Sequence, residues 1–406
     1  MHITMIALGS TGDILPYTVL GKGLLNAGCQ VRFATFETFK PRVKQLGLDF
    51  HPIPGDPRLM VAQGGSNIFS MARSFGSLVE DYTNALSAPH LLQTDLVVNQ
   101  LPGGMFGFDL AQKAAVPMVI AAVIPLVPTA RFPMMGFPDL QIPGMNRLTY
   151  QIADLAVWGL FGRKINTWRR HILGLPAISR KEYFGSAYSA NNLIVKGFSP
   201  LVVERPPEWG ENVHITGYWF PDDPDWQPPS SLTDFLEGGD PPVFIGFGSM
   251  PVKDPPALTR IILEALKKTG QRAVLSSGWA GLGSDHLPET VYPLDYAPYG
   301  WLFPRMAMVV HHGGSGTTGF ALLSGVPSCA VALGFDQVYW GRQIAALGAG
   351  PEPLRIKQLS SDHLAAAILE GINDQSMRRR AAELGKWIQE EDGLTEAVEI
   401  ILQAVA

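Results

Sequence analysis

Short apolar runs alternate along the chain with stretches in which apolar residues recur at helical spacing. Near the start, residues 2–8 form an apolar run, residues 17–27 carry apolar positions three or four apart, and residues 30–35 form the next run. The runs predict buried strands, and the spacing between them predicts a helix that Gly28 ends. The chain is therefore expected to begin with a βαβ unit, which belongs to a parallel sheet.

The same alternation returns in the second half of the chain. The predicted strands there are 243–247, 272–276, 306–310 and 328–333, and the predicted helices are 256–269, 317–324 and 338–347. Strands that alternate with helices indicate an α/β fold, and the repetition indicates two doubly wound halves.

The length of 406 residues also favours two domains, because it exceeds what one hydrophobic core usually supports. Prolines and aspartates cluster between residues 205 and 242, and proline stiffens a chain and removes backbone donors. The predicted division is an N-terminal Rossmann-like domain over 1–220, a Pro-rich linker over 221–241, a second Rossmann-like domain over 242–385 and a C-terminal helical segment over 386–406.

A glycine-rich loop with two histidines lies between the predicted strand 306–310 and the helix 317–324. It reads His311-His312-Gly313-Gly314-Ser315-Gly316-Thr317-Thr318. A strand-to-helix junction presents unpaired backbone N–H groups and the positive end of the helix dipole, and glycine lets a ligand approach the backbone. The loop therefore predicts a binding site for an anionic group such as a diphosphate.

Asp336 and Gln337 follow the next predicted strand, 328–333, at its carboxyl end. Ligands of open parallel sheets bind beyond these ends, where a carboxylate and an amide can hydrogen-bond sugar hydroxyls. The alternative is that Asp336 only caps the following helix. Together with the glycine loop, the pair favours a nucleotide-sugar site.

The loop after the first strand has a different character. It reads Gly9-Ser10-Thr11-Gly12-Asp13-Ile14-Leu15-Pro16 and does not match G-x-G-x-x-G. Glu37 is the one nearby acidic candidate for a ribose contact after the second strand. A dinucleotide site in this half is therefore not expected.

Five ordered motifs connect the chain to a known family. They are the loop 9–16, Gly246-Phe247-Gly248-Ser249-Met250, Trp301-Leu302-Phe303-Pro304, the histidine and glycine loop, and Asp336-Gln337. In these motifs the chain resembles the GT-B glycosyltransferases of family 1, specifically the sterol- and antibiotic-type enzymes of the UDP-glycosyltransferase superfamily. The resemblance covers essentially the whole chain. It implies a GT-B fold, in which two Rossmann-like domains face a cleft and a C-terminal helix crosses back to the acceptor-binding N-terminal domain.

The resemblance implies that Asp13 is the general base. A free aspartate has a pKa of about 3.9, so it can accept the proton of an alcohol only as the new bond to the sugar forms. The alternative is that Asp13 simply caps a helix that begins near Pro16. Ser10 and Thr11, on the same loop, are expected to line the acceptor pocket.

The resemblance also assigns the contacts to the donor diphosphate, with His311 as the histidine that touches phosphate. The expected phosphate-binding residues are Ser249, His311, Gly313, Gly314, Ser315, Gly316 and Thr317, and Asp336 and Gln337 are expected to bind the sugar. Backbone donors and a helix dipole can stabilise the leaving group, so no metal and no cofactor are expected. Adjacent histidines tend to point to opposite sides, which disfavours a metal pair. Asp222, Asp223 and Asp225 are interpreted as solvated linker charges.

Two further sets of residues complete the expected site. Ala297, Tyr299 and Trp301 lie in the segment that frames the nucleotide base in related enzymes, although Trp301 alone is as compatible with a core role. Phe132, Met134, Met135 and Phe137, with Leu59-Met60 and Ile68, Phe69 and Met71, are apolar segments that could line a lipophilic acceptor pocket. Ordinary core packing or a lid is the alternative.

Composition limits the remaining classes of function. A net charge of −5 gives no electrostatic case for nucleic acid, and two cysteines, Cys29 and Cys329, exclude a disulfide framework and fit a cytoplasmic protein. The first residues form a predicted strand without the basic and apolar regions of a signal peptide, so no signal peptide is expected. The most apolar stretch, 116–127, is short and contains two prolines, so no transmembrane helix is expected. Peripheral membrane contact stays open, although no basic amphipathic helix argues for it.

The sequence therefore predicts an inverting, metal-independent glycosyltransferase that moves a hexose, with glucose favoured, from a UDP-sugar to a hydroxyl of a sterol, polyketide or phenolic acceptor. Three alternatives stay open: a catalytically silent GT-B helper, a nucleotide-sugar epimerase and, last, an NAD-dependent dehydrogenase.

Overall fold

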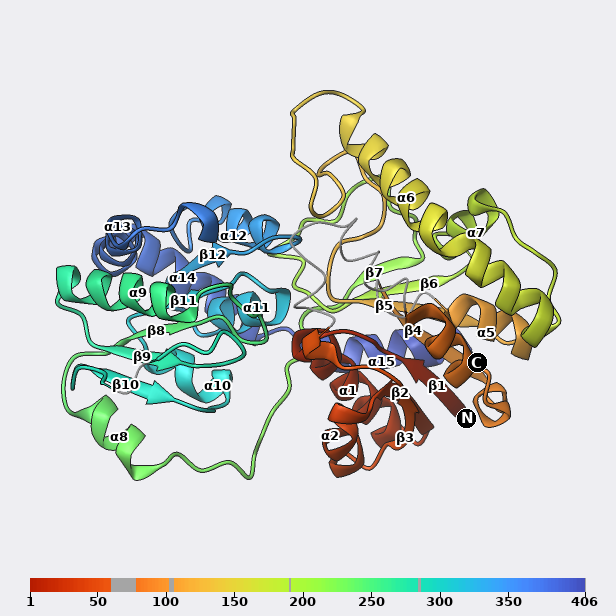
Figure 1. The fold of residues 1–406 in the computed structure, drawn as a ribbon, viewed down its shortest axis with the longest axis horizontal. Helices are drawn as coiled ribbons and strands as arrows, with labels where there is room; N and C mark the ends of the chain where they lie inside the picture. Colours follow the sequence, from red (N-terminus) through yellow and green to blue (C-terminus); the bar gives the residue numbers. More distant parts are fainter. Residues whose placement is uncertain (60–77, 102–105, 190, 284–285, 406) are drawn as a thin grey trace. The chain divides into compact units, whose positions relative to one another are not determined.

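The computed structural model describes residues 1–59, 78–101, 106–189, 191–283 and 286–405. By its contacts the chain divides into two compact units, one formed by 1–221 with 392–406 and the other by 222–391. Each unit contains one parallel sheet with helices around it (Figure 1).

The first unit is built on a seven-stranded parallel sheet in the order β3-β2-β1-β4-β5-β6-β7. Its strands are β1 (His2–Ile6), β2 (Gln30–Phe36), β3 (Asp49–Ile53), β4 (Leu96–Gln100), β5 (Met118–Ala122), β6 (Leu193–Lys196) and β7 (Val213–Ile215). Its helices are α1 (Thr11–Asn26), α2 (Lys40–Gln45), α5 (Gly107–Ala114), α6 (Met145–Trp168), α7 (Arg180–Ala187) and α15 (Gly393–Gln403), with short helical segments η1 (Glu37–Phe39), η2 (Pro89–Leu92) and η3 (Arg169–Leu173). The strand order reverses between β1 and β4, which makes the carboxyl ends of these strands the expected ligand position.

The second unit repeats this plan with a six-stranded parallel sheet in the order β10-β9-β8-β11-β12-β13. Its strands are β8 (Val243–Gly246), β9 (Ala273–Ser276), β10 (Val291–Leu294), β11 (Met308–His311), β12 (Ser328–Ala332) and β13 (Leu354–Arg355). Its helices are α8 (Ser230–Glu237), α9 (Pro255–Thr269), α10 (Tyr299–Leu302), α11 (Ser315–Leu323), α12 (Gln337–Ala346), α13 (Ser361–Asn373) and α14 (Gln375–Gln389), with η4 (Phe303–Arg305) and η5 (Ile356–Gln358). Here the order reverses between β8 and β11.

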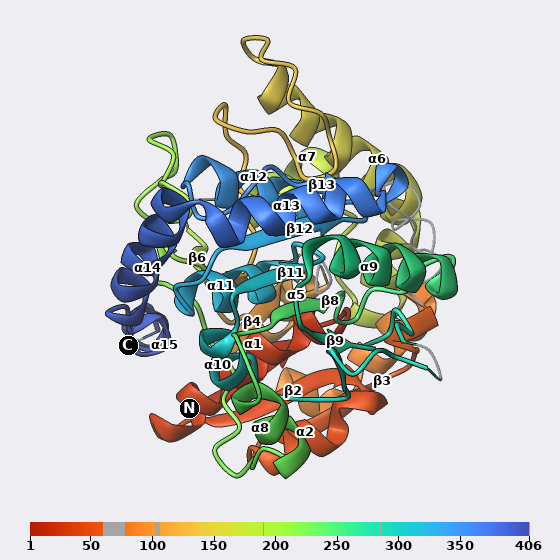
Figure 2. The ribbon, with the colours of Figure 1, turned by 90° about the vertical axis from the view of Figure 1, so that its left-hand side faces the viewer.

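The core of the second unit follows the alternation of side chains along its strands. Val243 and Ile245 of β8 share a buried cluster with residues of α9 and α13, which cover one face of the sheet (Figure 2). Phe244, between them, points to the other face and lies 4.9 Å from the ring of Phe303 and 5.7 Å from that of Tyr299. A strand buried on both faces is a continuous apolar run, which is the pattern that predicts it.

The end of the chain returns to the first unit. Helix α14 belongs to the second unit, and α15, which follows it, packs on α1 of the first. Val398 and Leu394 lie directly against Gly23 of α1, which leaves no room for a Cβ atom there. The two parallel α/β sheets confirm the predicted fold class, although the returning helix begins at Gly393 rather than at 386.

Two element boundaries differ from the sequence prediction. Helix α1 begins at Thr11 and contains Pro16 inside it, because Ser10 and Asp13 form a capping box that starts the helix earlier. The Pro-rich stretch 221–241 contains α8, whose apolar face buries Leu232. Proline density alone therefore marked as linker a segment that includes a helix.

A fully buried ion pair joins α5 to the end of α6 in the first unit. The Arg169 guanidinium donates to the Asp109 carboxylate, to Gln112 Oε1 at 2.8 Å and to the Pro176 carbonyl at 2.9 Å. Burial raises the pKa of Asp109, and the neighbouring Arg169 opposes that rise. The pair therefore depends on both partners, because either charge left alone would be buried without compensation.

Replacing Arg169 with methionine is expected to lower the free energy of unfolding by about 3–5 kcal/mol, because the Asp109 charge loses its partner. The matched control is Arg131→Met, which breaks an exposed 3.0 Å pair with Glu204 and is expected to cost less than about 1 kcal/mol. Denaturant unfolding of both variants measures the difference. Equal costs would show that the buried pair is no more important than the exposed one.

Candidate functional site

The carboxyl ends of four strands meet at one edge of the second sheet. His311 of β11 pairs in register with Gly246 of β8 and Ala330 of β12, and Gly246 pairs with Ser276 of β9. The loops that follow these strands touch, since Trp279 N–H donates to the Gly248 carbonyl at 2.8 Å. The predicted phosphate and sugar residues are thus gathered at the reversal point of this sheet.

The glycine loop leads directly into α11. Gly314 is the N-cap residue and Ser315 the first helical residue, so Gly316 and Thr317 lie in the first turn rather than in the loop. N–H groups in the first turn of a helix have no acceptor inside it, and the helix dipole adds partial positive charge. Ser249 lies on the loop after β8, the strand that pairs with β11, and is half-buried in a turn in which Met250 N–H donates to the Phe247 carbonyl.

His311 is fully buried, and its protonation can be assigned from its contacts. Gly313 N–H donates to His311 Nδ1 at 3.1 Å, so a neutral ring carries its proton on Nε2. Burial, with a smaller contribution from His312, lowers the pKa of His311 to about 3. Nε2 is buried and has no hydrogen-bond partner among the described residues. The site therefore holds an N–H donor that finds no acceptor in the described part of the chain.

His312 occupies a different place. Its ring stands at 86° to that of His311 with 6.4 Å between centroids, and it lies against Gly248 and Gly314. Burial lowers the pKa of His312 to about 4. The two rings do not converge on one point, and the described residues contain no group of three metal-ligating side chains.

Gly313 brings the histidine loop against the loop that carries the predicted sugar ligands. Its φ of +86° suits glycine, and a Cβ atom there would lie 2.7 Å from the Gln337 carbonyl oxygen. Phe335, the residue before Asp336 and Gln337, has a φ of +50°. A non-glycine residue in this region is strained, and such strain is found at functional sites.

Asp336 and Gln337 are both tied into the structure. Asp336 is the N-cap residue of α12, but its side chain makes no capping hydrogen bond. Its Oδ2 atom instead accepts a hydrogen bond from Trp340 Nε1 at 2.9 Å. Gln337 Oε1 accepts from the backbone N–H groups of Leu333 at 2.7 Å and Gly334 at 3.2 Å. These bonds orient the Gln337 amide, and they leave its N–H₂ group as the end that can donate.

Because His311 is held neutral, stability is expected to depend on pH. Its folded pKa lies below the unfolded value of about 6.5, so its contribution is complete above that pH and is lost as the pH falls toward the folded value of about 3. The expected loss is about 1 kcal/mol for each pH unit below 6.5. Thermal unfolding midpoints between about pH 7 and pH 5 measure it, and His311→Leu should flatten the profile. An unchanged profile would mean that the ring is already charged in the fold.

In the segment predicted to bind the nucleotide base, the aromatic side chains already pack against other side chains of the protein. Tyr299 stacks on Phe303 with 4.4 Å between centroids, and burial raises the pKa of Tyr299 to about 12. Trp301 has Arg305 over its ring at 4.2 Å and Trp226 beside it at 5.1 Å. Ala297 is buried. Both aromatic rings therefore have a partner in the protein.

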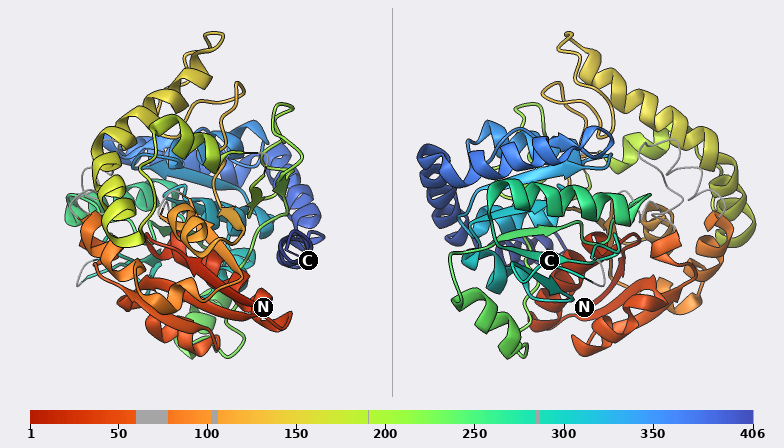
Figure 3. Two further views of the ribbon diagram at one scale, coloured as in Figure 1. Left: turned by 90° about the vertical axis from the view of Figure 1, so that its right-hand side faces the viewer. Right: turned by 60° about the vertical axis from the view of Figure 1, so that its left-hand side comes forward.

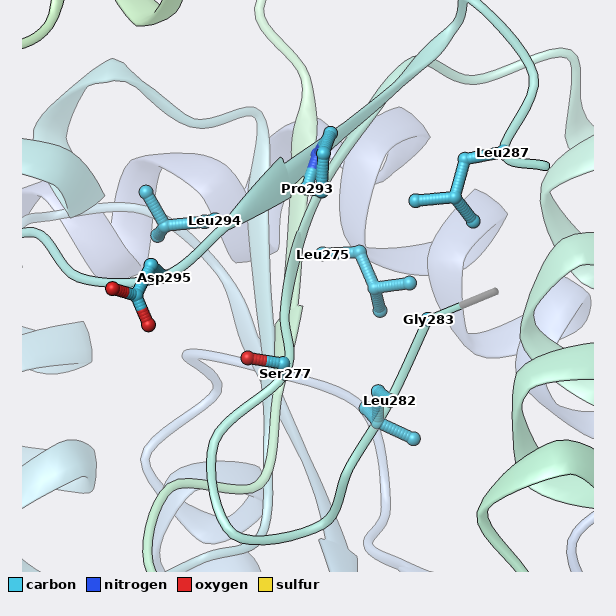
Figure 4. Close-up of a pocket in the computed structure, with 8 residues that line it drawn as sticks. All are labelled: Leu275, Ser277, Leu282, Gly283, Leu287, Pro293, Leu294 and Asp295. Carbon is cyan, nitrogen blue, oxygen red and sulfur yellow. The ribbon is translucent and has the colours of Figure 1, made fainter. Parts of the chain in front are cut away.

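A pocket of about 210 Å³ lies beyond the carboxyl ends of β9 and β10, next to that segment. Figure 4 shows Ser277 and Asp295 on one side of it and Leu282 and Leu287 on the other. Asp295 directly precedes the predicted base segment. Sequence reasoning did not find this pocket, because Ser277 and Asp295 belong to no motif and only the fold brings them together.

Asp13 lies in the first unit, at the reversal point between β1 and β4. Its Oδ2 atom accepts from the Ser10 N–H and from the Ser10 hydroxyl, both at 2.8 Å. Its Oδ1 atom accepts no hydrogen bond among the described residues. Burial raises the pKa of Asp13, and the two Ser10 hydrogen bonds oppose the rise. One oxygen therefore stabilises the helix start, and the other is available to a ligand.

Gly9, which belongs to the predicted loop motif, and Tyr17, which the sequence analysis did not select, both interact with Asp13. A Cβ atom on Gly9 would lie 2.5 Å from the Asp13 side chain, so the carboxylate packs directly on the glycine. Tyr17, one helical turn after Asp13, is buried, and burial followed by the Asp13 charge raises its pKa. The i, i+4 spacing was the signal that could have identified Tyr17. Ser10 and Thr11 are half-buried beside this carboxylate.

The predicted acceptor residues divide into two groups. Phe132 and Met135 are buried, and the Phe132 ring meets Trp209 at 6.5 Å, as core residues do. Met134 and Phe137 are half-buried in a turn, in which Phe137 N–H donates to the Met134 carbonyl. Leu59 is exposed, and Met60, Ile68, Phe69 and Met71 lie outside the described residues.

Two family models match the chain. Residues 3–124 match the glycosyltransferase family 28 N-terminal domain, and residues 263–403 match the C-terminal domain of proteins like erythromycin biosynthesis protein CIII. The first match covers β1 to β5 of the first sheet, and the second covers β9 to β13 of the second sheet and continues into α15. The first model is a glycosyltransferase domain by its description.

Curated relatives agree. Two sterol 3-beta-glucosyltransferases of Arabidopsis thaliana are 33% and 34% identical over 98% of this chain, which spans 64% and 67% of their lengths. A sterol 3-beta-glucosyltransferase of Cryptococcus neoformans is 32% identical over 99% of this chain, which spans 27% of it.

Solved structures show the same fold at low identity. The glycosyltransferase of kitacinnamycin matches with a TM-score of 0.76 and 17% identity over 100% of this chain and 99% of its own. A Streptomyces glycosyltransferase complexed with thymidine diphosphate matches with a TM-score of 0.67 and 20% identity over 99% of both chains. Given these matches, the chain belongs to the GT-B glycosyltransferases of family 1, in the group of the sterol and antibiotic enzymes.

Proposed function

We propose that this protein transfers glucose from UDP-glucose to the hydroxyl of a lipophilic acceptor, with a sterol as the first candidate, by direct displacement and without a metal ion. The observation that carries the proposal is the buried His311 Nε2–H at the end of β11, which has no hydrogen-bond partner among the described residues and precedes the loop that leads into α11. A diphosphate oxygen is the acceptor that this donor and the helix N-terminus fit together.

On the donor side, the first-turn N–H groups of α11 and His311 hold the diphosphate, with Ser249 and the Gly313–Thr317 stretch around it. The Gln337 amide and the Asp336 carboxylate hydrogen-bond the sugar hydroxyls, which supports a hexose over a deoxysugar. We place the base beside Ala297, Tyr299 and Trp301, toward the pocket of Ser277 and Asp295. The names of the curated relatives support glucose as the sugar.

The reaction needs one proton transfer. The acceptor oxygen attacks the anomeric carbon, the bond from that carbon to the diphosphate breaks, and the acceptor's proton passes to Asp13 Oδ1. Because the pKa of Asp13 is raised above that of a free aspartate, the carboxylate is a stronger base than in water. A single displacement from an α-linked donor gives a β-linked product.

Charge left on UDP is stabilised by groups that are already in place. The neutral His311 donates one hydrogen bond, and the α11 N-terminus contributes partial positive charge, so no proton transfer to the leaving group is required. We therefore propose that a divalent cation is not required.

The test is product formation in EDTA. Purified protein is incubated with UDP-glucose and a panel of sterols, flavonoids and macrolactones, and a hexose increment is sought by mass spectrometry, with dTDP-glucose as the matched donor control. A glucosylated sterol supports the proposal. UDP-glucose binding with no transfer to any acceptor favours a silent helper, and conversion of the free UDP-sugar to its epimer favours an epimerase.

A further inference from the structure

Tyr17 joins the helix that carries Asp13 to the end of strand β5. Its hydroxyl donates a hydrogen bond to the Ala121 carbonyl at 3.3 Å and accepts one from the Val123 backbone. Tyr17 lies four residues after Asp13 in α1, so the two side chains leave the helix on the same face. In the sheet order β1-β4-β5, the Tyr17 side chain therefore reaches two strands beyond β1.

The Tyr17 ring is buried and braced by a second aromatic ring. It is 1% exposed, and it meets Trp219 edge-on with 6.0 Å between centroids. Trp219 Nε1 donates to the Thr216 hydroxyl at 3.2 Å, and a Cβ atom on Gly197 would lie 2.7 Å from the indole. Because the indole is packed this closely, it holds the Tyr17 ring in one place.

The Tyr17 hydroxyl also keeps its proton at neutral pH. Burial, and then the charge of Asp13, raise the pKa of Tyr17, and the hydrogen bond from the Val123 backbone opposes the rise. An ionised phenol could not donate to the Ala121 carbonyl. The link from α1 to β5 therefore does not depend on the protonation of a group that titrates near neutral pH.

A second buried hydrogen bond fixes the other end of the Asp13 loop. Gln100, the last residue of β4, accepts from the Leu8 N–H through Oε1 at 3.1 Å. Gly9 follows directly and packs on the Asp13 side chain. With the loop held at β4 and the helix held at β5, the Asp13 carboxylate has a defined position at the edge of the sheet.

The segment that Tyr17 anchors leads into the predicted acceptor region. Figures 1 and 3 show the chain between β5 and α6, in orange to yellow, leaving the sheet as an irregular loop. Val123 and Ile124, at its start, are buried, and the predicted acceptor residues follow between 132 and 137. The Tyr17 hydroxyl thus bonds the first residues of this loop from the helix that carries the proposed base.

We propose that Tyr17 is a positioning residue for sugar transfer, which holds the Asp13 helix at a fixed distance from the acceptor segment after β5. The inference rests on the proposed function, which makes Asp13 the base. A base must lie within hydrogen-bond reach of the acceptor hydroxyl, and a displacement of about 1 Å can cost about a hundredfold in rate.

Water provides an internal comparison for this alignment. Water can take the place of the acceptor hydroxyl in the same displacement: its oxygen bonds to the anomeric carbon, the bond to the diphosphate breaks, and its proton passes to Asp13, which gives free glucose and UDP. A small, mobile molecule depends less on the distance between Asp13 and the acceptor segment than a large acceptor does.

The test compares Tyr17→Phe with the matched control Tyr183→Phe. Both changes remove one hydroxyl from a buried ring of the first unit, and the Tyr183 hydroxyl, 3.5 Å from Asp109, has no role in the proposed site. Each protein is incubated with UDP-glucose and the acceptor that the wild type glucosylates, and glucoside and free glucose are measured together. Their ratio does not depend on the concentration of folded enzyme, so a loss of stability alone cannot change it.

For Tyr17→Phe, the ratio of glucoside to free glucose is expected to fall by at least about tenfold, whereas Tyr183→Phe keeps the wild-type ratio. Affinity for UDP, measured by calorimetry, should be unchanged in both, because the donor residues lie in the second unit. Amide hydrogen exchange at Val123 should become faster in Tyr17→Phe alone, since its hydrogen-bond acceptor is lost.

The proposal is overturned if Tyr17→Phe keeps the wild-type ratio, or if the ratio falls equally in both variants. Unchanged exchange at Val123 would also overturn it. A wild type that binds UDP-glucose and forms no glucoside contradicts the proposed function instead, and the exchange at Val123 then shows by itself whether Tyr17 holds α1 to β5.

Discussion

Replacing Asp13 with asparagine is expected to lower the turnover number for glucosyl transfer by between about a hundredfold and about ten-thousandfold, with little change in the KM for UDP-glucose. The amide oxygen can still accept the hydrogen bond from Ser10 N–H, so the start of α1 is kept. The amide cannot take up the acceptor's proton, so the loss lies in the chemical step. Initial rates over a range of UDP-glucose concentrations, with the unfolding midpoint of each protein, measure the effect.

The matched control for this experiment is Ser10→Ala. It removes the hydroxyl that donates to Asp13 Oδ2 at 2.8 Å and leaves the backbone N–H in place. A stability cost of about 1 kcal/mol and a rate change below about tenfold are expected. If Asp13→Asn keeps the full rate, Asp13 is not the base. If both variants lose the same activity, Asp13 acts by shaping the loop.

The second large effect is expected at His311. Replacing it with alanine should reduce the turnover number by about a hundredfold to a thousandfold, because one prearranged hydrogen-bond donor to the departing diphosphate is lost. Affinity for UDP should fall as well, since the same donor meets the ground-state diphosphate. Steady-state rates and calorimetric titration with UDP give the two quantities.

His363→Ala is the control for that variant. His363 is exposed on α13, and its Nδ1 lies 3.0 Å from the Gln358 carbonyl, outside any predicted contact with the donor. It should bind UDP and turn over like the wild type. Normal UDP affinity in His311→Ala would remove the observation on which the donor site depends.

The alternation of elements could be predicted because both sheets are parallel and buried. A strand such as 243–246 is a continuous apolar run, and a glycine ends each predicted helix from Gly28 to Gly348. Once the strands were identified, the gathering of His311 and Gln337 at one sheet edge followed from the parallel topology. That edge is where the structure brings them together.

Element boundaries near the site were harder to predict, since they depend on side-chain hydrogen bonds. The Ser10 and Asp13 capping box starts α1 at Thr11, five residues before the proline that the sequence reading took as the first turn. In the same way, Trp226 lies beside Trp301 although it is far away in the sequence, and no local pattern connects the two. Phe303 and Arg305 follow Tyr299 and Trp301 at the i, i+4 spacing, so these two ring contacts could have been predicted from the sequence.

Helix α6 shows a different limit. Periodicity reveals a helix when apolar residues occupy one side, and α6 carries them on two. Only a structure separates Tyr150 and Ile165, which are buried, from Ile152 and Leu155, which are exposed.

The most direct test of the proposed mechanism is the anomeric configuration of the product. UDP-α-glucose and a sterol are incubated with the protein in EDTA, and the proton coupling at the anomeric carbon of the isolated glycoside is measured by NMR. The mechanism predicts a β-glucoside that the wild type forms and Asp13→Asn does not. An α-glucoside, or a β-glucoside formed equally well by Asp13→Asn, would contradict direct displacement with Asp13 as the base.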